Sequence, residues 1–216
     1  MLREVPNIEM SVYEHRDRAM PREEIIAELS KGADGLLCLL TDKIDGELID
    51  AAKGRVKIVS TMSVGYNHVD TGALKQRGID LGFTPDCLTE TTADTTVVLL
   101  MTTARRVGEA IAAAKDGSWG TWDPLWMCGK DVHSSTVGIV GFGRIGQAVA
   151  RRLKAFGCKI LYTGPRQKPE AAEVGAEFVS EDELFASSDF VVPMFPLNDA
   201  TRGFFNKVGM IPNPTL

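Results

Sequence analysis

Short apolar runs alternate along the chain with windows of helical periodicity, a pattern typical of α/β proteins. The apolar runs predict strands, and the periodic windows between them predict helices. The predicted strands are 35–40, 56–61, 79–83, 136–140, 159–162, 178–179 and 189–192, with 8–13 as the one candidate before the first helix. The predicted helices are 22–29, 45–52, 69–77, 89–107 and 147–156. The order predicts an α/β chain of two domains, residues 1–87 and 88–216.

The predicted helix 89–107 stands between the two βα blocks. Thr89 is a suitable N-cap, and Glu90 suits the first turn of a helix. Its apolar face is broad, which is typical of a helix buried between layers or domains. The segment 117–133 that follows has no regular pattern and carries all three tryptophans, Trp119, Trp122 and Trp126.

The second block opens with a glycine fingerprint, G-x-G-x-x-G at 141–146, between a strand pattern and a helix pattern. In this context the fingerprint indicates a dinucleotide-binding turn, whereas an ordinary glycine-rich strand-to-helix turn is the alternative. Gly141 would permit the tight turn, Gly143 would let the backbone approach a pyrophosphate, and Gly146 would let helix and strand pack closely. The helix N-terminus would then offer N–H groups to the anion.

The end of the second strand of this block bears on the choice of nucleotide. Proteins that bind NAD in this way usually have an acidic residue about 20 residues after the fingerprint. Here the segment 161–168 has no carboxylate and contains Arg166 and Lys168. The arginine would bind a 2′-phosphate with charge-assisted hydrogen bonds, so NADP is favoured. A Gly-Pro turn with solvated basic residues is the alternative, and it leaves NAD open.

Composition excludes several classes of protein. The chain has 216 residues, is 44% hydrophobic and carries a formal net charge of −5, which argues against nucleic-acid binding. Its apolar stretches are far below membrane-spanning length, and its first ten residues lack a signal-peptide core. The four cysteines stand far apart and the three histidines do not cluster near them, so neither a metal site nor a disulfide is expected. These features favour a cytoplasmic enzyme.

Several ordered motifs together resemble the D-2-hydroxyacid dehydrogenases, most closely their glyoxylate and hydroxypyruvate reductases. The motifs cover nearly the whole chain and include 35–40, 60–65, 83–86, 88–93, 124–129 and 135–157. The resemblance implies a flavodoxin-like substrate domain at 1–87 and a Rossmann cofactor domain at 88–216. It further implies that the substrate is a small 2-keto or 2-hydroxy acid. The implied cofactor is NADP, and NAD is the alternative.

The resemblance also implies roles for individual residues. Val64 and Gly65 resemble the pair whose backbone amides hold the substrate carboxylate, and a glycine turn after a core strand is the alternative. Pro196 resembles part of a loop along the cofactor, and Thr92 a position near the nicotinamide. The full implied cofactor set is Gly141, Phe142, Gly143, Arg144, Ile145, Gly146, Thr163, Arg166, Gln167, Lys168, Pro196 and Thr92.

The chain departs from the pattern of the family at its catalytic residues. The family uses an Arg, a Glu and a His that follow the region of 204–210, so no catalytic residue is assigned. None of His15, His68 and His133 is placed to be the general acid, and His68 is interpreted as structural or surface. Asp94 stands where the family usually has Glu. We therefore expect a chain clipped at both ends, without its first strand and its last strands, and inactive as a reductase.

The expectation about partner subunits comes from the tryptophan-containing segment 117–133. In the reductases that it resembles, this segment crosses to the partner subunit, and the residue like Trp126 borders the neighbour's substrate site. A homodimer, or a heterodimer with a full-length relative, is expected; a loop folded back on its own subunit is the alternative. A non-catalytic nucleotide-binding or regulatory module that pairs with such a relative is the competing function, and a non-functional fragment is a third.

Overall fold

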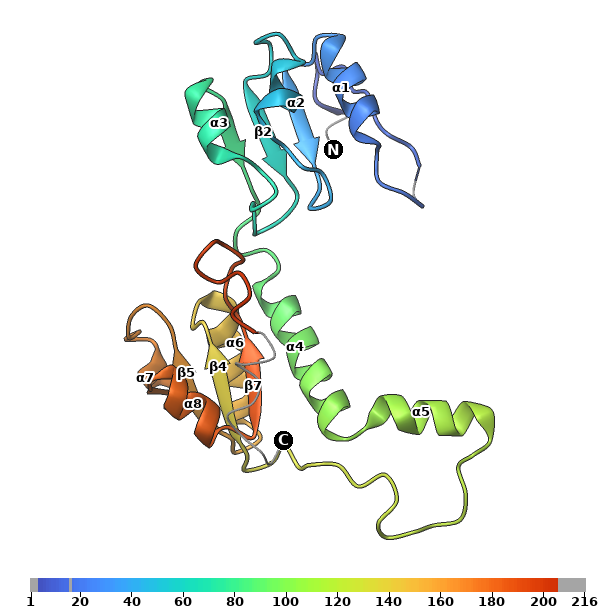
Figure 1. Ribbon diagram of the computed structural model, residues 1–216, viewed down its shortest axis with the longest axis vertical. Helices are drawn as coiled ribbons and strands as arrows, with labels where there is room; N and C mark the ends of the chain where they lie inside the picture. Colours follow the sequence, from blue (N-terminus) through green and yellow to red (C-terminus); the bar gives the residue numbers. More distant parts are fainter. Residues whose placement is uncertain (1–3, 16, 206–216) are drawn as a thin grey trace. The chain divides into compact units, whose positions relative to one another are not determined.

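The computed structural model describes residues 4–15 and 17–205, and the chain divides into two compact units, Met1–Pro85 and Asp86–Leu216 (Figure 1). Each unit is mixed α/β and is built on a sheet of parallel strands. The predicted α/β fold class is thereby confirmed. Within the described residues, no helix combines the length and the apolar character that crossing a membrane requires.

The first unit has a three-stranded sheet in the order β1-β2-β3. A parallel sheet in sequential order is one side of a flavodoxin-like arrangement. Its buried residues include Leu29, Val59 and Leu74, which fill the space between helices and sheet. The elements are α1 (Arg22–Ser30), β1 (Gly35–Cys38), α2 (Gly46–Asp50), β2 (Ile58–Thr61), α3 (Thr71–Gln76) and β3 (Asp80–Gly82).

The short helices of this unit begin at aspartates. The side chain of Asp45 accepts a hydrogen bond from the Leu48 amide, and that of Asp70 accepts one from the Ala73 amide. Such caps satisfy N–H groups that a helix start leaves unpaired. The strand predicted at 8–13 is wrong, because this segment pairs with no strand and leaves its apolar residues Ile8 and Val12 exposed.

The second unit has a four-stranded parallel sheet in the order β6-β5-β4-β7. Numbered along the unit, this is the 3-2-1-4 order with which a Rossmann sheet begins. The short helices α7 and α8 were not predicted, because one or two turns give too few residues for a periodic pattern. The elements are β4 (Thr136–Val140), α6 (Arg144–Lys154), β5 (Lys159–Thr163), α7 (Ala171–Val174), β6 (Glu177–Phe178), α8 (Glu181–Ser187) and β7 (Phe190–Pro193).

Two layers of helix cover this sheet. On one face, α6 and α4 (Thr89–Ala104) pack around a core that includes Val137, Ile139 and Leu153. On the other face α8 lies so close to β4 that a side chain at Gly138 would overlap Leu184. The strands are therefore buried on both faces, which explains their continuous apolar runs.

The helix predicted at 89–107 is in fact two helices. α4 ends at Ala104, and α5 (Val107–Asp116) follows after Arg106, whose backbone is left-handed at φ 53°. Thr89 is not the N-cap as predicted: Leu88 holds that position and makes no side-chain cap bond. The buried face of α4 is also narrower than predicted, because Val98 is exposed.

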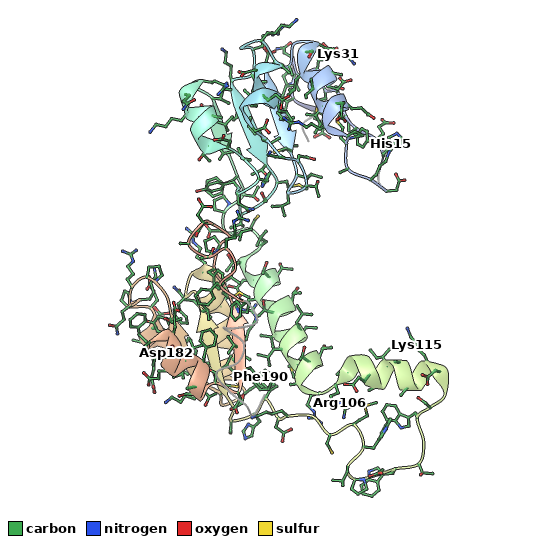
Figure 2. The ribbon with its side chains drawn as sticks, viewed as in Figure 1. His15, Lys31, Arg106, Lys115, Asp182 and Phe190 are labelled. Atoms are coloured by element: carbon green, nitrogen blue, oxygen red, sulfur yellow. The ribbon has the colours of Figure 1, made fainter. Side chains whose placement is uncertain are left out.

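Residues 107–131, called the arm below, comprise α5 and the irregular tryptophan segment (Figures 1 and 2). The arm returns to its starting point, where the Lys130 amide donates to the Ala104 carbonyl at 2.8 Å. Inside it, the rings of Trp119 and Trp126 meet edge to face with centroids 4.7 Å apart. Trp122 is 87% exposed. The predicted irregular segment is confirmed, and its most exposed tryptophan is Trp122.

Candidate functional site

The glycine loop lies at the carboxyl end of β4, between the ends of β5 and β7. The Gly141 amide donates to the Thr163 carbonyl at 2.9 Å, and the Met194 amide donates to the Val140 carbonyl at 2.7 Å. Gly141 has φ 93°, and a Cβ there would lie 2.6 Å from the Met194 carbonyl oxygen. Because β4 and β7 are the strands between which the order of the sheet reverses, the loop occupies the topological switch point where such sheets bind ligands.

The start of α6 is arranged for an anion. No side chain caps this helix and its first turn has no acidic residue, so its backbone N–H groups remain available. No atom lies within 4 Å of a Cβ built on Gly143, whereas one built on Gly146 would lie 2.5 Å from the Gly141 carbonyl oxygen. Gly143 thus leaves open space, and Gly146 permits close packing of helix on loop. These residues fit a pyrophosphate.

The other loop residues divide into buried and exposed side chains. Phe142 is buried, and its ring stacks on Tyr162 with centroids 4.2 Å apart. Ile145 is half-buried and packs against the core of the unit. Arg144 is exposed, and its Nε lies 2.8 Å from Asp86 Oδ1. Only the arginine can therefore turn its charge toward a bound group, and it would leave this exposed ion pair to do so.

The segment after β5 presents the predicted nucleotide-selective residues. Thr163 is buried, whereas Arg166 and Gln167 are exposed. The Lys168 amide donates to the Tyr162 hydroxyl at 2.9 Å, which fixes the backbone of the loop. Gln167 and Lys168 line an open hollow of about 460 Å³ together with Pro169, Ala171, Ala172 and Ala176. Within the described residues neither basic side chain of this loop is in an ion pair, so both are available for an anion.

Pro196 and Thr92 belong to the same unit but lie on other elements. Pro196 follows β7 and is exposed, and its carbonyl accepts a hydrogen bond from Thr201 Oγ1 at 2.7 Å. Thr92 is half-buried in the first turns of α4. Asp94, the unusual acid, has its Oδ1 2.6 Å from Arg152 Nε on α6. In the structure this carboxylate joins two helices rather than facing the loop.

In the first unit, Val64 and Gly65 form part of the turn after β2. Neither of their backbone N–H groups has an acceptor among the described residues. Gly65 is exposed, and the nearest atom to a Cβ built there is Asn67 Oδ1 at 3.6 Å. Two unpaired amides beside an open glycine can bind a carboxylate. The turn therefore has the donors that the predicted substrate site requires.

Three polar side chains that the sequence analysis did not assign to the site lie behind this turn. Thr61 Oγ1 is 2.7 Å from Ser63 Oγ and 2.9 Å from His68 Nε2. Ser63 Oγ in turn donates to the Gly65 carbonyl at 2.7 Å. His68 was expected to be structural or surface, and it is half-buried with Nδ1 enclosed and unpartnered. The sequence did hold one signal for this group: Thr61 and Ser63 are hydroxyl residues at and just after the end of a strand in the core.

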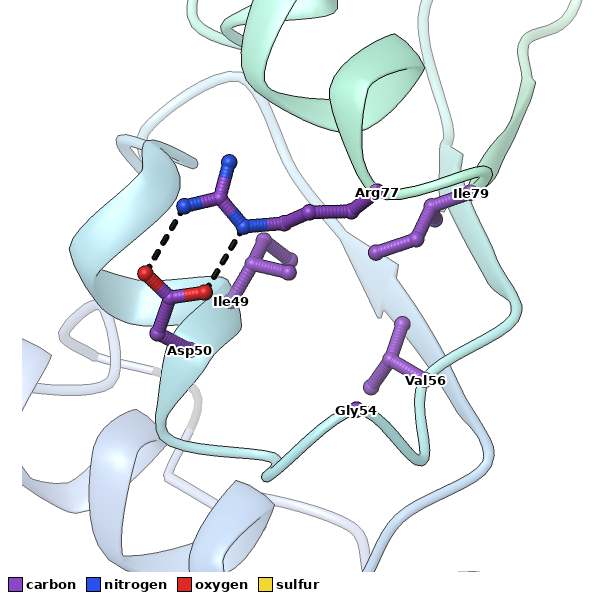
Figure 3. A pocket seen from close by; sticks show the side chains of 6 residues that line it. All are labelled: Ile49, Asp50, Gly54, Val56, Arg77 and Ile79. Carbon is purple, nitrogen blue, oxygen red and sulfur yellow. Dashed lines mark hydrogen bonds and ion pairs between the residues drawn. The ribbon is translucent and has the colours of Figure 1, made fainter.

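A small cavity of about 70 Å³ lies elsewhere in the first unit (Figure 3). Ile49, Val56 and Ile79 form its apolar wall. Arg77 Nε and Nη2 each donate to a carboxylate oxygen of Asp50 at 2.7 Å, and this pairing lowers the pKa of Asp50. The one cation that lines the cavity is thus held by this ion pair.

The remaining candidate ligands are dispersed. All four cysteines are free thiols. The ring of His133 is engaged, with Nδ1 3.1 Å from the Phe156 carbonyl and Nε2 3.0 Å from Ser134 Oγ. In the part of the chain that the structure describes, no three His, Cys, Asp or Glu residues are grouped so that they could hold a metal ion.

Comparisons with known proteins agree with this geometry. Residues 97–210 match the sequence model of the D-isomer specific 2-hydroxyacid dehydrogenase, NAD binding domain. The glyoxylate reductase/hydroxypyruvate reductase of Homo sapiens is 53% identical over 193 residues, which are 88% of this chain and 58% of that protein. The glyoxylate reductase of Thermococcus kodakarensis is 45% identical over 196 residues, again 88% of this chain and 58% of that protein.

A solved structure is similar over both units. The TT0316 protein from Thermus thermophilus superposes with a TM-score of 0.83 at 41% identity, over 90% of this chain and 61% of that one. The chain therefore spans about three fifths of the length of the proteins that it matches.

Proposed function

Because the chain belongs to the D-isomer specific 2-hydroxyacid dehydrogenases, we propose that it carries the nucleotide site and the substrate-carboxylate site of an NADP(H)-linked reductase of glyoxylate or hydroxypyruvate. The observation that carries the proposal is the glycine loop at the switch point, with the uncapped start of α6 beside it. The nicotinamide would supply the hydride. The residues of this chain would bind and orient the two reactants.

The preference for NADP over NAD rests on the loop after β5. Its basic side chains Arg166 and Lys168 form no ion pair with residues 4–15 or 17–205, and Gln167 adds a hydrogen-bonding group beside them. A 2′-phosphate would receive charge-assisted hydrogen bonds there, whereas a ribose hydroxyl would gain little from cations. NAD remains the alternative cofactor.

Calorimetric titration of the chain with NADPH and NADH tests this choice. The native chain should bind NADPH more tightly, and Arg166→Asp should reverse the preference by repelling the phosphate. Lys53→Asp is the matched control, because it makes the same charge change at an exposed, left-handed position of the first unit. Equal affinity of the native chain for both nucleotides would remove the role proposed for Arg166.

The substrate end of the proposal rests on Val64 and Gly65, whose free amides would hold the carboxylate of a small 2-keto or 2-hydroxy acid. A carboxylate that accepts two backbone N–H groups is bound through its charge without a basic side chain. This leaves the rest of a small substrate open to hydride transfer. The roles of Pro196 and Thr92 beside the cofactor remain part of the proposal.

Assembly through the arm is a further part of the proposal. Trp122 and Leu125 are 87% and 83% exposed, and Ile111 and Val98 add exposed apolar surface on α5 and α4. Large apolar side chains exposed together mark interaction sites. We propose that the chain forms a homodimer. The alternative is a heterodimer with a full-length relative, in which this chain is a non-catalytic, nucleotide-binding subunit.

We also propose that the 216-residue polypeptide by itself does not reduce keto acids. Two of its histidines are engaged within the first and second units, His68 with Thr61 and His133 with the Phe156 carbonyl. His15 lies beside Tyr13, with ring centroids 5.1 Å apart. The polypeptide would bind nucleotide without turnover. A cytoplasmic location completes the proposal and is supported by the four free thiols.

A further inference from the structure

The turn that carries Val64 and Gly65 is held from behind by a continuous series of hydrogen bonds. The contacts run from His68 Nε2 to Thr61 Oγ1 at 2.9 Å, on to Ser63 Oγ at 2.7 Å, and on to the Gly65 carbonyl oxygen at 2.7 Å. Thr61 and Ser63 are buried. These three side chains are called the Thr61 relay below.

The protons of the Thr61 relay can be assigned from its three short contacts, and a further hydrogen bond between Thr61 and the Cys38 thiol does not change the assignment. The Gly65 carbonyl only accepts, so the single hydroxyl proton of Ser63 points to it. Ser63 Oγ must then accept from Thr61, which uses the single hydroxyl proton of Thr61. Thr61 Oγ1 must therefore accept from His68 Nε2–H. If Thr61 donated to His68 instead, the two hydroxyl oxygens would face each other at 2.7 Å with no proton between them.

The ends of the Thr61 relay are fixed by the backbone. The Ile44 amide donates to the His68 carbonyl at 2.9 Å, and the Thr84 amide donates to the Ser63 carbonyl at 2.9 Å. The histidine is thus anchored to the segment just before α2, and the serine to the segment just after β3. The last hydrogen bond, from Ser63 Oγ to the Gly65 carbonyl, orients the peptide of the turn.

We propose that Thr61, Ser63 and His68 are positioning residues that hold the 64–66 turn with its two free amides set to receive the carboxylate of the substrate. The proposal rests on the function proposed above for Val64 and Gly65. None of the three side chains needs to touch the substrate. A glycine peptide is flexible by itself, so an ordered turn lowers the entropy lost when the carboxylate binds.

The matched variants Thr61→Val and Thr61→Ser test the proposal. Valine has the shape of threonine without the hydroxyl and breaks the Thr61 relay, whereas serine keeps the hydroxyl and loses a buried methyl group. The isotopically labelled 216-residue chain is titrated with pyruvate, and affinity is read from the amide shifts of Val64 and Gly65 by NMR. Thr61→Val should bind roughly two- to tenfold more weakly, as for one lost hydrogen bond, and Thr61→Ser should bind like the native chain.

Melting temperature and the tautomer of His68 provide the readouts that separate positioning from packing. A purely structural role makes affinity follow stability, so Thr61→Ser would then lose affinity along with its methyl group. Long-range ¹H–¹⁵N spectra should show His68 protonated at Nε2. A proton on Nδ1 with a bare Nε2 overturns the directed series.

The outcomes also distinguish this inference from the proposed function. If pyruvate moves the amides of the native chain and Thr61→Val binds it equally well, the positioning role is wrong and the carboxylate site stands. If pyruvate leaves the amides of Val64 and Gly65 unmoved in the native chain, the proposed carboxylate site is wrong, and the positioning role falls with it.

Discussion

Substitution of alanine at two glycines of the fingerprint should separate folding from nucleotide binding. At Gly141 the backbone has φ 93°, and an added Cβ would lie 2.6 Å from the Met194 carbonyl oxygen and 3.0 Å from the Phe195 amide nitrogen. Both neighbours are backbone atoms and cannot rotate away. At Gly143 the φ is −79° and no atom lies within 4 Å.

The two sites predict different costs. For Gly141→Ala, a left-handed alanine costs about 1–2 kcal/mol, and overpacking costs typically 1–3 kcal/mol. The unfolding free energy of the second unit should fall by about 2–5 kcal/mol. For Gly143→Ala, the loss of a glycine N-cap costs about 0.5–1 kcal/mol, but the new methyl group occupies the space left for the pyrophosphate. NADPH binding should weaken about tenfold or more, equal to about 1.4 kcal/mol or more.

Urea unfolding followed by circular dichroism gives the stability, and hydrogen exchange of the peptide 136–154 assigns the loss to the second unit. Calorimetry gives the affinity for NADPH. Gly141→Ala should lose exchange protection in that peptide even without nucleotide, whereas Gly143→Ala should keep it and lose affinity. A Gly141→Ala chain as stable as the native one would refute the close approach of β7 to the loop. A Gly143→Ala chain with native affinity would refute the pyrophosphate assignment.

Three further predictions follow from the same structure. Trp122→Ser combined with Leu125→Ser should shift sedimentation toward the monomer at unchanged melting temperature, since both side chains are exposed; a native chain that sediments as a monomer at micromolar concentration contradicts the interface. The pKa of Asp189 is lowered chiefly by its hydrogen bond with Lys130. The pair therefore stabilises the fold fully at pH values above the ordinary aspartate pKa, and this stabilisation is lost as the pH falls through the lowered pKa. Lys130→Met should raise that pKa in a ¹³C titration of the carboxyl group, and an unchanged titration contradicts the pairing. The purified 216-residue polypeptide should not oxidise NADPH with glyoxylate or hydroxypyruvate, and turnover near ordinary dehydrogenase rates, without a contaminating enzyme, contradicts this.

The parallel strands could be predicted from sequence because helices cover both faces of the second sheet. A strand buried on both faces must be apolar throughout, and the runs at β4 and β5 satisfy this. The glycine fingerprint could also be recognised from sequence. Gly146 must be a glycine because of the Gly141 carbonyl, five residues away, and Gly141 because of the Met194 carbonyl just after the neighbouring strand. The role of the fingerprint in binding stays a prediction.

Other features depend on contacts that no local pattern records. The break between α4 and α5 falls at Arg106, a residue type that rarely adopts left-handed backbone. The Thr61 relay joins the last residue of β2 to two residues of the irregular turn that follows it, so no single periodic element contains all three. Only the fold of the turn after β2 brings His68 back to the end of that strand. The segment 8–13 had the composition of a strand without a neighbour to pair with.

The closure of the arm has a consequence for how this protein can vary. Its two ends meet at the carbonyl of Ala104, which accepts the Lys130 amide, and Gly129 packs so closely there that any side chain would overlap that oxygen. The base of the arm is therefore closed by backbone contacts. The length and sequence of the arm can therefore change, in evolution or by grafting, without altering the distance that the chain must span at its base.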